Sequence, residues 1–374
     1  MKDYTILAPM MSEIHFGLME AAARSCGYNI EVLRNETREV VEDGQKFVNN
    51  DACYPSTIAV GQIMNAVLSG KYDTNHLAVL MGQTGGGCRL SNYIGFIRRA
   101  LDQAGMGHIP VISLNVNGME TSPGFRFTIP MMLALSKGVI LGDVLMKVLY
   151  ATRPYEKEKG AANALYRKWE AVCKEYLSKR SLLFHKKEMN EVIRGMVHDF
   201  DTLERTGEKK KRVGITGELM MQYSRVANNN LVDVLEKEGS EAVIPTLFEV
   251  PQSWLVDAIY AHDHYGKSAW SKKMAQTAIH ILDNIRMSTV KILDGSRHFT
   301  AGASMSHMME LAGKIVSIGN QTGEGWMLAG QIAAMIEEGV TSFICVQPFG
   351  CLPNHIIGKG SLKNSGRCIR KLIL

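Results

Sequence analysis

Short apolar runs, separated by stretches of helical periodicity, fill the first part of the chain. After the run 77–81, apolar residues recur every three or four positions between 91 and 104, which is the spacing of one helix face. Gly27 follows another periodic stretch, 14–26, and is typical of a helix end. Strands that alternate with helices at this pitch predict a parallel sheet covered by helices on both faces. The predicted strands of this part are 4–9, 29–33, 77–81 and 110–116.

The segment 153–211 breaks this alternation and differs in composition. It is rich in Lys, Arg and Glu, and its apolar residues form stripes at helical spacing. We interpret it as two or more helices that connect two lobes, and its charges as a solvated face. Residues 1–152 then form the first α/β lobe, and residues 212–374 form the second.

The pattern of strands and helices starts again after residue 211. Runs at 212–218, 241–247 and 341–346 are predicted strands, and a strand–helix pair is predicted within 314–339. The complete prediction is an α/β protein with two doubly wound, Rossmann-like parallel-sheet lobes joined by a helical segment.

Composition changes this picture little but excludes some classes of partner. The chain has 374 residues, of which 46% are hydrophobic and 21% are charged, as in ordinary globular proteins. A net charge of +5 is small for this length and argues against a nucleic-acid partner. The long apolar stretch 131–150 is interrupted by Lys and Asp residues, so no membrane span is expected there.

The seven cysteines indicate a reducing compartment rather than a disulfide framework. Their number is odd, the chain is long, and no two of them are spaced as CxxC. We therefore expect a cytoplasmic protein with reduced thiols. The missing CxxC pairs also exclude the simplest zinc and thioredoxin-like sites.

One glycine-rich stretch, 82-GQTGGGCRLSNY-93, lies between a predicted strand and a predicted helix, where phosphate groups often bind. Its Gly82 and Gly87 have the spacing of an ATP-binding loop. The lysine and the hydroxyl residue that such a loop requires are replaced by Cys88 and Arg89, so nucleotide binding is not expected. The alternatives are a flexible turn and a loop that presents a thiolate.

Three cysteines occupy similar positions relative to the predicted elements. Cys88 and Cys351 each follow an apolar strand, and Cys53 immediately precedes a helix. Ligand sites in parallel sheets lie at the carboxyl ends of the strands, and helix N-termini stabilise thiolates. Thiolates held in this way are the ligands of iron–sulfur clusters, so the three positions are candidate cluster ligands.

A free cysteine is more often a small buried hydrophobe than a ligand, so each of these residues has a plain alternative role. Cys345 lies inside an apolar strand, where a core role and a ligand role are both open. Cys26, Cys173 and Cys368 lie in helical or tail contexts and are interpreted as unliganded. Glycines beside a ligand would let backbone N–H groups approach the sulfur atoms, and the glycines in that position are Gly85, Gly86 and Gly87.

Three further side chains near these loops are candidates for catalytic roles on the open side of such a site. Glu324, in the glycine-rich turn 319–326, is either a proton-transfer group or an ordinary loop acid. His355 is a ligand, a base or a loop histidine. Arg89 follows Cys88 directly.

Four stretches of the chain bear a resemblance to a known family: 47-FVNNDACYPS-56, 80-LMGQTGGGCRLSNYI-94, 323-GEGWMLAG-330 and 347-QPFGCLPNHIIGKG-360. They resemble the acyl-CoA dehydratase activase-related proteins, relatives of the subunits of 2-hydroxyglutaryl-CoA dehydratase and benzoyl-CoA reductase. The resemblance spans about residues 2–360. In many of these proteins the same region is fused behind an ATPase activase of the actin/Hsp70-like type.

The resemblance implies an iron–sulfur protein of anaerobic electron transfer. Related dehydratase subunits hold a 4Fe–4S cluster with three cysteines, and the matching residues here are Cys53, Cys88 and Cys351. It also implies an ATP-dependent activase partner that delivers a low-potential electron, an acyl-CoA thioester as substrate, and a dimer. Double-cubane cluster reductases are further relatives, so a 2-hydroxyacyl-CoA dehydratase-like component and a reductase component both stay open.

Two departures from the family pattern keep other hypotheses open. No ATPase signature is visible, so the activase, which is in cis in many relatives, would act in trans. The tail 361–374 is basic and unlike the family, and we expect the second lobe to be truncated there. The main alternative is a non-catalytic regulatory or scaffold subunit that binds an activase or dehydratase without an intact cluster. A third hypothesis makes Cys88 a nucleophile beside a histidine, but no sequence feature specifies that histidine.

Overall fold

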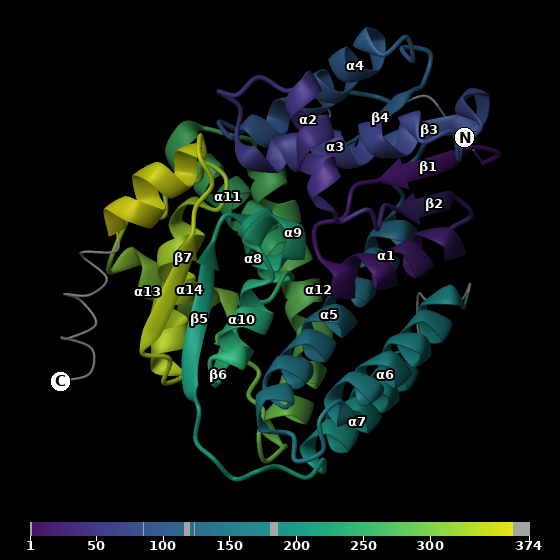
Figure 1. Cartoon of the computed structure of the whole chain (residues 1–374). Helices are drawn as coiled ribbons and strands as arrows, with labels where there is room; N and C mark the ends of the chain where they lie inside the picture. The colour runs from purple at the N-terminus through teal and green to yellow at the C-terminus, as the bar shows by residue number, and fades with distance from the viewer. Residues whose placement is uncertain (1, 85, 116–119, 123, 180–185, 362–374) are drawn as a thin grey trace.

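The computed structural model describes residues 2–84, 86–115, 120–122, 124–179 and 186–361. The protein is an α/β fold with two parallel sheets, one of four strands and one of three (Figure 1). The fold class and the parallel sheets predicted from the sequence are thus confirmed. The tail from residue 362 onward, where truncation was predicted, and Gly85 lie outside the described residues.

The four-stranded sheet has the order β2-β1-β3-β4, and every neighbouring pair is parallel. Successive side chains of a strand point to opposite faces of the sheet. Leu7 and Val79 therefore join the core on one face, and Ile6 and Ala78 join the core on the other. Burial of both faces explains why the strands appear in the sequence as continuous apolar runs. The strands are β1 (Thr5–Ala8), β2 (Asn29–Val32), β3 (Leu77–Gly82) and β4 (Val111–Leu114).

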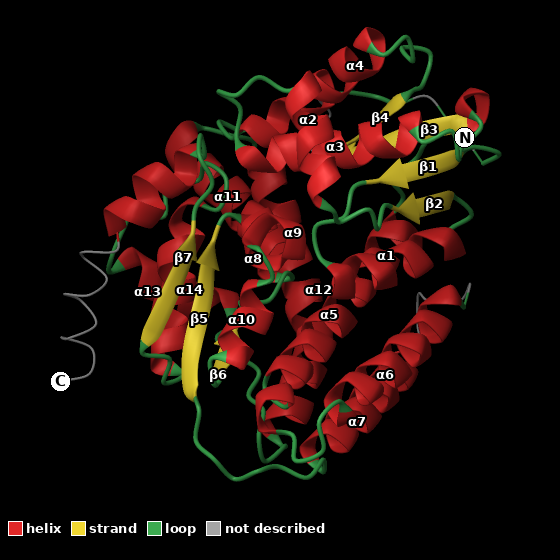
Figure 2. Cartoon of the chain, in the orientation of Figure 1, coloured by secondary structure: helices red, strands yellow, loops and turns green. Residues whose placement is uncertain are grey.

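Helices cover both faces of this sheet (Figure 2). Two of them, α2 and α3, approach each other closely because glycines leave room at their contact. A Cβ added to Gly61 would lie 1.9 Å from the carbonyl oxygen of Val40, and one added to Gly44 would lie 2.0 Å from that of Thr57. The helices of this lobe are α1 (Glu13–Ser25), α2 (Arg38–Phe47), α3 (Tyr54–Leu68) and α4 (Tyr93–Gln103).

Three long helices pack on one another beside the first lobe: α5 (Ile129–Tyr150), α6 (Ala161–Ser178) and α7 (Lys186–Asp201). The last two belong to the segment 153–211. The stretch Ile129–Tyr155 is long and apolar enough to span a membrane by length and composition, but 67% of its most apolar window is buried inside the protein. α5 is the central helix of the largest core, which also includes residues of α1, α6, α7 and the second lobe.

The three-stranded sheet of the second lobe has the order β6-β5-β7 and is parallel throughout. The strand predicted within 314–339 is wrong, whereas the helix predicted there is present. The N–H groups of Ile315 and Val316 both donate to the carbonyl oxygen of Ala312, so the chain extends the preceding helix instead of pairing with a strand. The strands are β5 (Lys211–Gly217), β6 (Ser240–Val243) and β7 (Ser342–Val346).

Seven helices complete the second lobe, and short helical turns connect several elements. The helices are α8 (Leu219–Tyr223), α9 (Arg225–Asn228), α10 (Leu231–Lys237), α11 (Glu249–Tyr265), α12 (Ala269–Asp294), α13 (Met305–Gly313) and α14 (Gly325–Glu337). The turns are η1 (Thr74–His76), η2 (Arg89–Asn92), η3 (Arg153–Tyr155) and the π-helical η4 (Asn354–Gly358).

Candidate functional site

The three predicted cluster ligands lie at the ends of elements. Cys53 is the residue before α3, Cys88 follows β3 and precedes η2, and Cys351 follows β7. All three are free thiols; Cys53 and Cys351 are buried and Cys88 is half-buried. Cys88 and Cys351 therefore occupy the kind of position at which parallel sheets place their ligands, whereas Cys53 lies in the loop between α2 and α3.

Contacts between the three loops bring them together. The Arg89 guanidinium, next to Cys88, donates a hydrogen bond to the carbonyl oxygen of Asp51, two residues before Cys53. Gly350, next to Cys351, packs against both groups. A Cβ added there would lie 3.3 Å from Arg89 Nη1 and 3.4 Å from the Asp51 oxygen. Segments from both lobes thus meet at the carboxyl ends of β3 and β7.

The turn before α14 joins the same place. A Cβ on Gly87 would lie 3.3 Å from Thr322 Cγ2, and one on Gly323 would lie 2.7 Å from Pro353 Cγ. Figure 2 shows β5 and β7 pointing toward the first lobe, which is why the loops after these strands reach it. We call this junction the cysteine site and define it by its three cysteines and two carboxylates: Cys53, Cys88, Cys351, Glu218 and Glu324.

The two carboxylates occupy the turns at the start of neighbouring helices. Glu218 directly follows β5, where its N–H donates to the Val346 carbonyl (3.0 Å), and its side chain caps α8 by accepting from Met221 N–H (2.9 Å). Glu324 precedes α14 and accepts from the N–H of Leu219 (3.0 Å). The second bond connects the two turns, so both carboxylates are held close to each other.

The electrostatics of the cysteine site disfavour negative charge. Burial, with smaller contributions from the charges of Glu324, Cys53 and Glu218, raises the pKa of the Cys88 thiol to about 12. Burial, with Glu324 and Glu218, likewise raises the pKa of Cys351 to about 12. Without a cation at the site, both cysteines are neutral thiols at pH 7.

The pKa values of the two carboxylates are raised as well. Burial and, to a smaller extent, repulsion by Glu324 together raise the pKa of Glu218 to about 8, and burial also raises the pKa of Glu324. The helix N-termini were expected to stabilise thiolates at this site. For Cys88 and Cys351 that expectation is wrong, because desolvation outweighs the backbone hydrogen bonds that each sulfur receives.

Polar side chains fix the orientation of two of the thiols. Cys53 Sγ lies 2.8 Å from the hydroxyl of Tyr93, the first residue of α4. Asn354 Nδ2 donates to Cys351 Sγ at 3.2 Å. Cys345 lies within β7 opposite Thr216, and its sulfur accepts a hydrogen bond from Gln347, its own neighbour along the chain.

The remaining predicted residues are distributed around the site. Arg89 is exposed and bridges two loops, and Glu324 lies within the site. His355 is exposed, and its N–H donates to the Cys351 carbonyl at 3.1 Å. Gly86 and Gly87 are exposed, and Ser91 Oγ donates to the Gly86 carbonyl.

Glu218 and Tyr93 were not predicted from the sequence as site residues. Glu218 directly follows an apolar strand, and this strand-end position was the one signal available. Tyr93 belongs to the glycine-rich stretch itself, but nothing in its sequence position indicates contact with a thiol 40 residues earlier.

The donors that this site offers to a metal or cluster are three thiols from separate loops and two carboxylates. No group of three or more His, Cys, Asp or Glu side chains in the described parts of the chain is spaced to hold one metal ion. The thiolates of an iron–sulfur cluster can come from separate segments of the chain. Sulfur ligands also suit iron–sulfur chemistry, whereas Mg²⁺ and Ca²⁺ prefer oxygen.

Comparisons of the chain with protein-family models, with curated proteins and with solved structures returned no match. Its function is therefore argued from the chemistry of the site.

Proposed function

We propose that this protein is an iron–sulfur protein in which Cys53, Cys88 and Cys351 hold a 4Fe–4S cluster. The convergence of their three loops is the observation that supports this proposal most directly. The loops come from distant parts of the chain, yet Arg89, Asp51 and Gly350 lie in contact. Cysteines that only fill the core would not require their three loops to lie in contact.

The charges of the site support the same proposal. Because the pKa values of two thiols and two carboxylates are raised, a bound cation would be required to keep all four groups ionised at pH 7. Iron supplies that charge and keeps coordinating thiols deprotonated. When bound, a cluster of this kind transfers single electrons at low potential.

The residues around the thiols have separate roles in this proposal. Tyr93 and Asn354 orient the sulfur atoms and donate hydrogen bonds that tune the potential. Backbone N–H groups of Gly86 and Gly87 donate to the cluster in this proposal; Gly85, the third glycine of the prediction, lies outside the described residues. Glu324, which is near both Cys88 and Cys351, handles protons, while Arg89 and His355 line the open side.

The wider proposal follows from the resemblance described above. An ATP-dependent activase of the actin/Hsp70-like type acts in trans as electron donor, and an acyl-CoA thioester is the substrate of a dehydratase-like or double-cubane-type reaction. The two sheets belong to doubly wound, Rossmann-like lobes. The protein functions in an anaerobic cytoplasm, as a dimer.

Anaerobic purification tests the proposal. We expect a brown protein with about four irons and four labile sulfides per chain, and an EPR signal after reduction. A colourless, folded protein that takes up no iron on reconstitution would refute it.

A second candidate function is a non-catalytic subunit that binds an activase or dehydratase without a cluster. The side chains of Phe349, Leu352 and Ile356 favour it, because they flank Cys351 and are 72%, 47% and 58% exposed. Exposed apolar patches mark docking surfaces. A pull-down with an activase, with and without ATP, separates the two candidates: binding that persists in a triple Cys→Ser variant does not require the cluster.

A further inference from the structure

A serine, a histidine and an aspartate form a hydrogen-bonded chain far from the cysteines in the sequence. Ser12 Oγ lies 2.7 Å from His15 Nδ1, and His15 Nε2 lies 3.0 Å from Asp143 Oδ1. All three are buried, with His15 fully so. These are the contacts of a nucleophile, a base and an orienting carboxylate.

The carboxylate fixes the histidine tautomer. Asp143 also accepts hydrogen bonds from the N–H groups of Leu247 (2.6 Å) and Phe248 (3.0 Å), so it is an acceptor on every side. His15 Nε2 must then carry the proton, which leaves the Nδ1 lone pair directed at Ser12. Gly142 makes room for the ring, since a Cβ there would lie 2.5 Å from His15 Cδ2.

Ser12 lies where a nucleophile is typically placed. It follows β1 and precedes α1, at the carboxyl edge of the sheet, where the strand order reverses between β1 and β3. Unlike the serine of a nucleophile elbow, which occupies a strained turn between strand and helix, Ser12 has an extended backbone (φ −140°, ψ 116°). Its side chain caps no N–H of α1, so the hydroxyl is committed to His15. The first-turn N–H groups of a helix have no partner within the helix and can receive an oxyanion.

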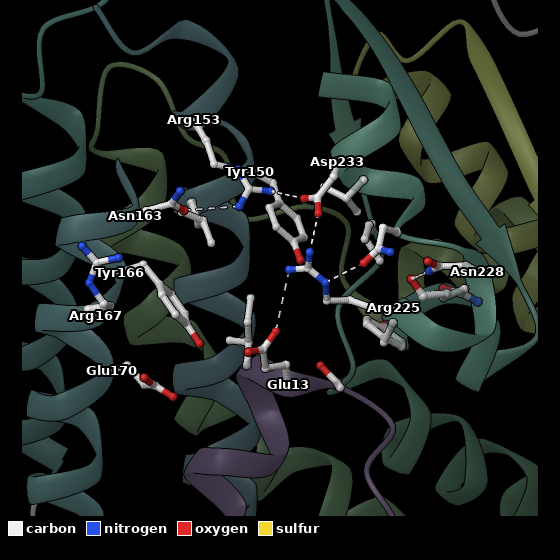
Figure 3. Close-up of a pocket in the computed structure, with 18 residues that line it drawn as sticks. Glu13, Tyr150, Arg153, Asn163, Tyr166, Arg167, Glu170, Arg225, Asn228 and Asp233 are labelled. Atoms are coloured by element: carbon white, nitrogen blue, oxygen red, sulfur yellow. Dashed lines mark hydrogen bonds and ion pairs between the residues drawn. The ribbon is translucent and has the colours of Figure 1, made fainter. Parts of the chain in front are cut away.

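Ser12, Glu13 and Ile14 also line a cavity of about 390 Å³. We call it the junction cavity, because its wall is built by α1, α5, α6 and the α9–α10 region (Figure 3). Its volume fits a small molecule. Its wall is polar, with equal numbers of arginines and carboxylates, which suits a polar ligand better than a lipid. The charged lining residues are Glu13, Arg153, Arg167, Glu170, Arg225 and Asp233.

Two tyrosines add an aromatic surface to this polar wall. Figure 3 shows Tyr150 of α5 and Tyr166 of α6 side by side in the view, with Arg225 on the far side of Tyr150 and Glu13 below. The Arg153 guanidinium lies over the Tyr150 ring, 5.4 Å from its centroid. Arg225 is held by Asn230 and Asp233, so the wall is ordered without a ligand.

From this geometry we propose that Ser12, His15 and Asp143 hydrolyse small polar carboxylic esters bound in the junction cavity. The proposal goes beyond the iron–sulfur function and does not depend on it, because the residues involved do not belong to the cysteine site. Ser12 is the nucleophile, His15 the base, and Asp143 the positioning residue.

The reaction balances without another reactant than water. Ser12 Oγ attacks the ester carbonyl carbon, its proton passes to His15 Nδ1, and the N–H groups of the first turn of α1 receive the oxyanion. The C–O bond to the alcohol then breaks, and the alcohol takes the proton from His15. Water, deprotonated by His15, cleaves the acyl-serine, releases the carboxylic acid and restores Ser12.

Covalent labelling tests the proposal on the full chain. A small fluorophosphonate should modify the folded wild-type protein once, and peptide mapping should locate the adduct on Ser12. No adduct, or an adduct on another residue, overturns the proposal. Labelling requires no iron, so its failure and the failure of the cluster proposal are separate results.

Ester hydrolysis gives the second measurement. The protein should hydrolyse p-nitrophenyl acetate faster than the octanoate, and Ser12→Ala should reduce the rate at least about 100-fold. Ser253→Ala is the matched control, because Ser253 is another buried serine whose hydroxyl donates only to the Val250 carbonyl. An equal loss in both variants, or no loss in Ser12→Ala, contradicts the proposal.

Asp143→Asn tests the positioning role. Loss of the carboxylate removes the acceptor that fixes the His15 tautomer, so labelling of Ser12 should slow by at least about 10-fold in the folded variant. Asp143→Glu retains a carboxylate and should recover part of the rate. Equal rates in the Asn and Glu variants, or an Asn variant that labels like wild type, contradict the role.

Discussion

The cysteine site and the junction cavity both lie where the lobes meet, but they handle charge in opposite ways. In the cysteine site Glu218 and Glu324 lie together beside thiols, and the pKa values of Cys88, Cys351 and both carboxylates are raised. In the junction cavity Arg153 is paired with Glu236, and Arg225 is paired with Asp233. These two arginines have carboxylate partners, whereas the cysteine site gathers acidic groups without an opposite charge among its five defining residues. Ionisable groups of opposite sign that lie close together form ion pairs, whereas acidic groups that lie close together raise one another's pKa values.

The largest expected effect is the loss of iron from the cysteine site. Cys88→Ser removes one of three thiols, so iron content after anaerobic reconstitution should fall from about four to below one per chain. Cys173→Ala is the control, since Cys173 is buried in the core of α6 and should leave iron content unchanged. Equal iron in Cys88→Ser and wild type would show that the thiols are ordinary core residues.

A second variant tests whether ion pairs at the junction cavity stabilise the fold. Arg153→Ala leaves Glu236 without its partner in a site where these side chains are 16% and 13% exposed. We expect a loss of about 2–3 kcal/mol in the free energy of unfolding, measured by urea denaturation. Iron binding by the folded variant should not change.

The matched control for this variant is an exposed ion pair. Arg98→Ala breaks a pair with Glu120 whose side chains are 47% and 31% exposed, and should cost less than about 1 kcal/mol. Equal losses in the two variants would mean that burial does not distinguish the two pairs.

A smaller effect concerns the repulsion within the cysteine site. Glu324→Gln keeps an acceptor for Leu219 N–H but removes one negative charge, so the pKa of Cys88 should fall. In iron-free protein at pH 8.5, alkylation of Cys88 by iodoacetamide should become several-fold faster, as measured by peptide mass spectrometry. Glu310→Gln, which removes an exposed carboxylate paired with Lys314, should leave that rate unchanged.

The smallest expected effect concerns a buried carboxyl group outside the cysteine site that has no cationic partner among the described residues. Burial raises the pKa of Asp257 to about 7, and a hydrogen bond from Trp326 opposes the rise only in part. The unfolded state ionises near pH 4, so this group destabilises the fold increasingly as pH rises from about 4 to 7.

Asp257→Asn removes that pH-dependent loss. Its melting temperature relative to wild type should therefore increase steadily between pH 4.5 and 7.5, in parallel thermal melts of both proteins. A difference that stays constant with pH would place the ionisation of Asp257 outside this range.

Local patterns predicted much of the fold. The strands at β1, β3, β5 and β7 were visible because buried parallel strands are continuous apolar runs. The stretch after Lys314 was misjudged because its apolar residues pack beside a helix end, which produces the same local pattern as a strand. The spacing of apolar residues indicates which side chains are buried, but it does not indicate which groups the backbone bonds to.

The sites were predictable only in part, for a related reason. Cys53, Cys88 and Cys351 were found because each is next to an element end that the sequence reveals. Ser12 and Asp143 were not, because 128 positions separate His15 from its carboxylate partner, and only the packing of α1 on α5 joins them. Chemistry assembled across the tertiary fold leaves no local signal.

The spread of the cysteine site along the chain has a consequence for biosynthesis. Cys53 and Cys88 emerge from the ribosome more than 200 residues before Cys351 and the turn at Glu324. The first lobe can fold while its partner loops do not yet exist. Completion of the site therefore waits for the second lobe, and until then Cys53 has only Tyr93 of its own lobe as a partner and Cys88 lacks the cover of the second lobe. Exposed thiols are the ones that oxidants reach first, so the growing chain is more vulnerable to oxygen than the finished protein.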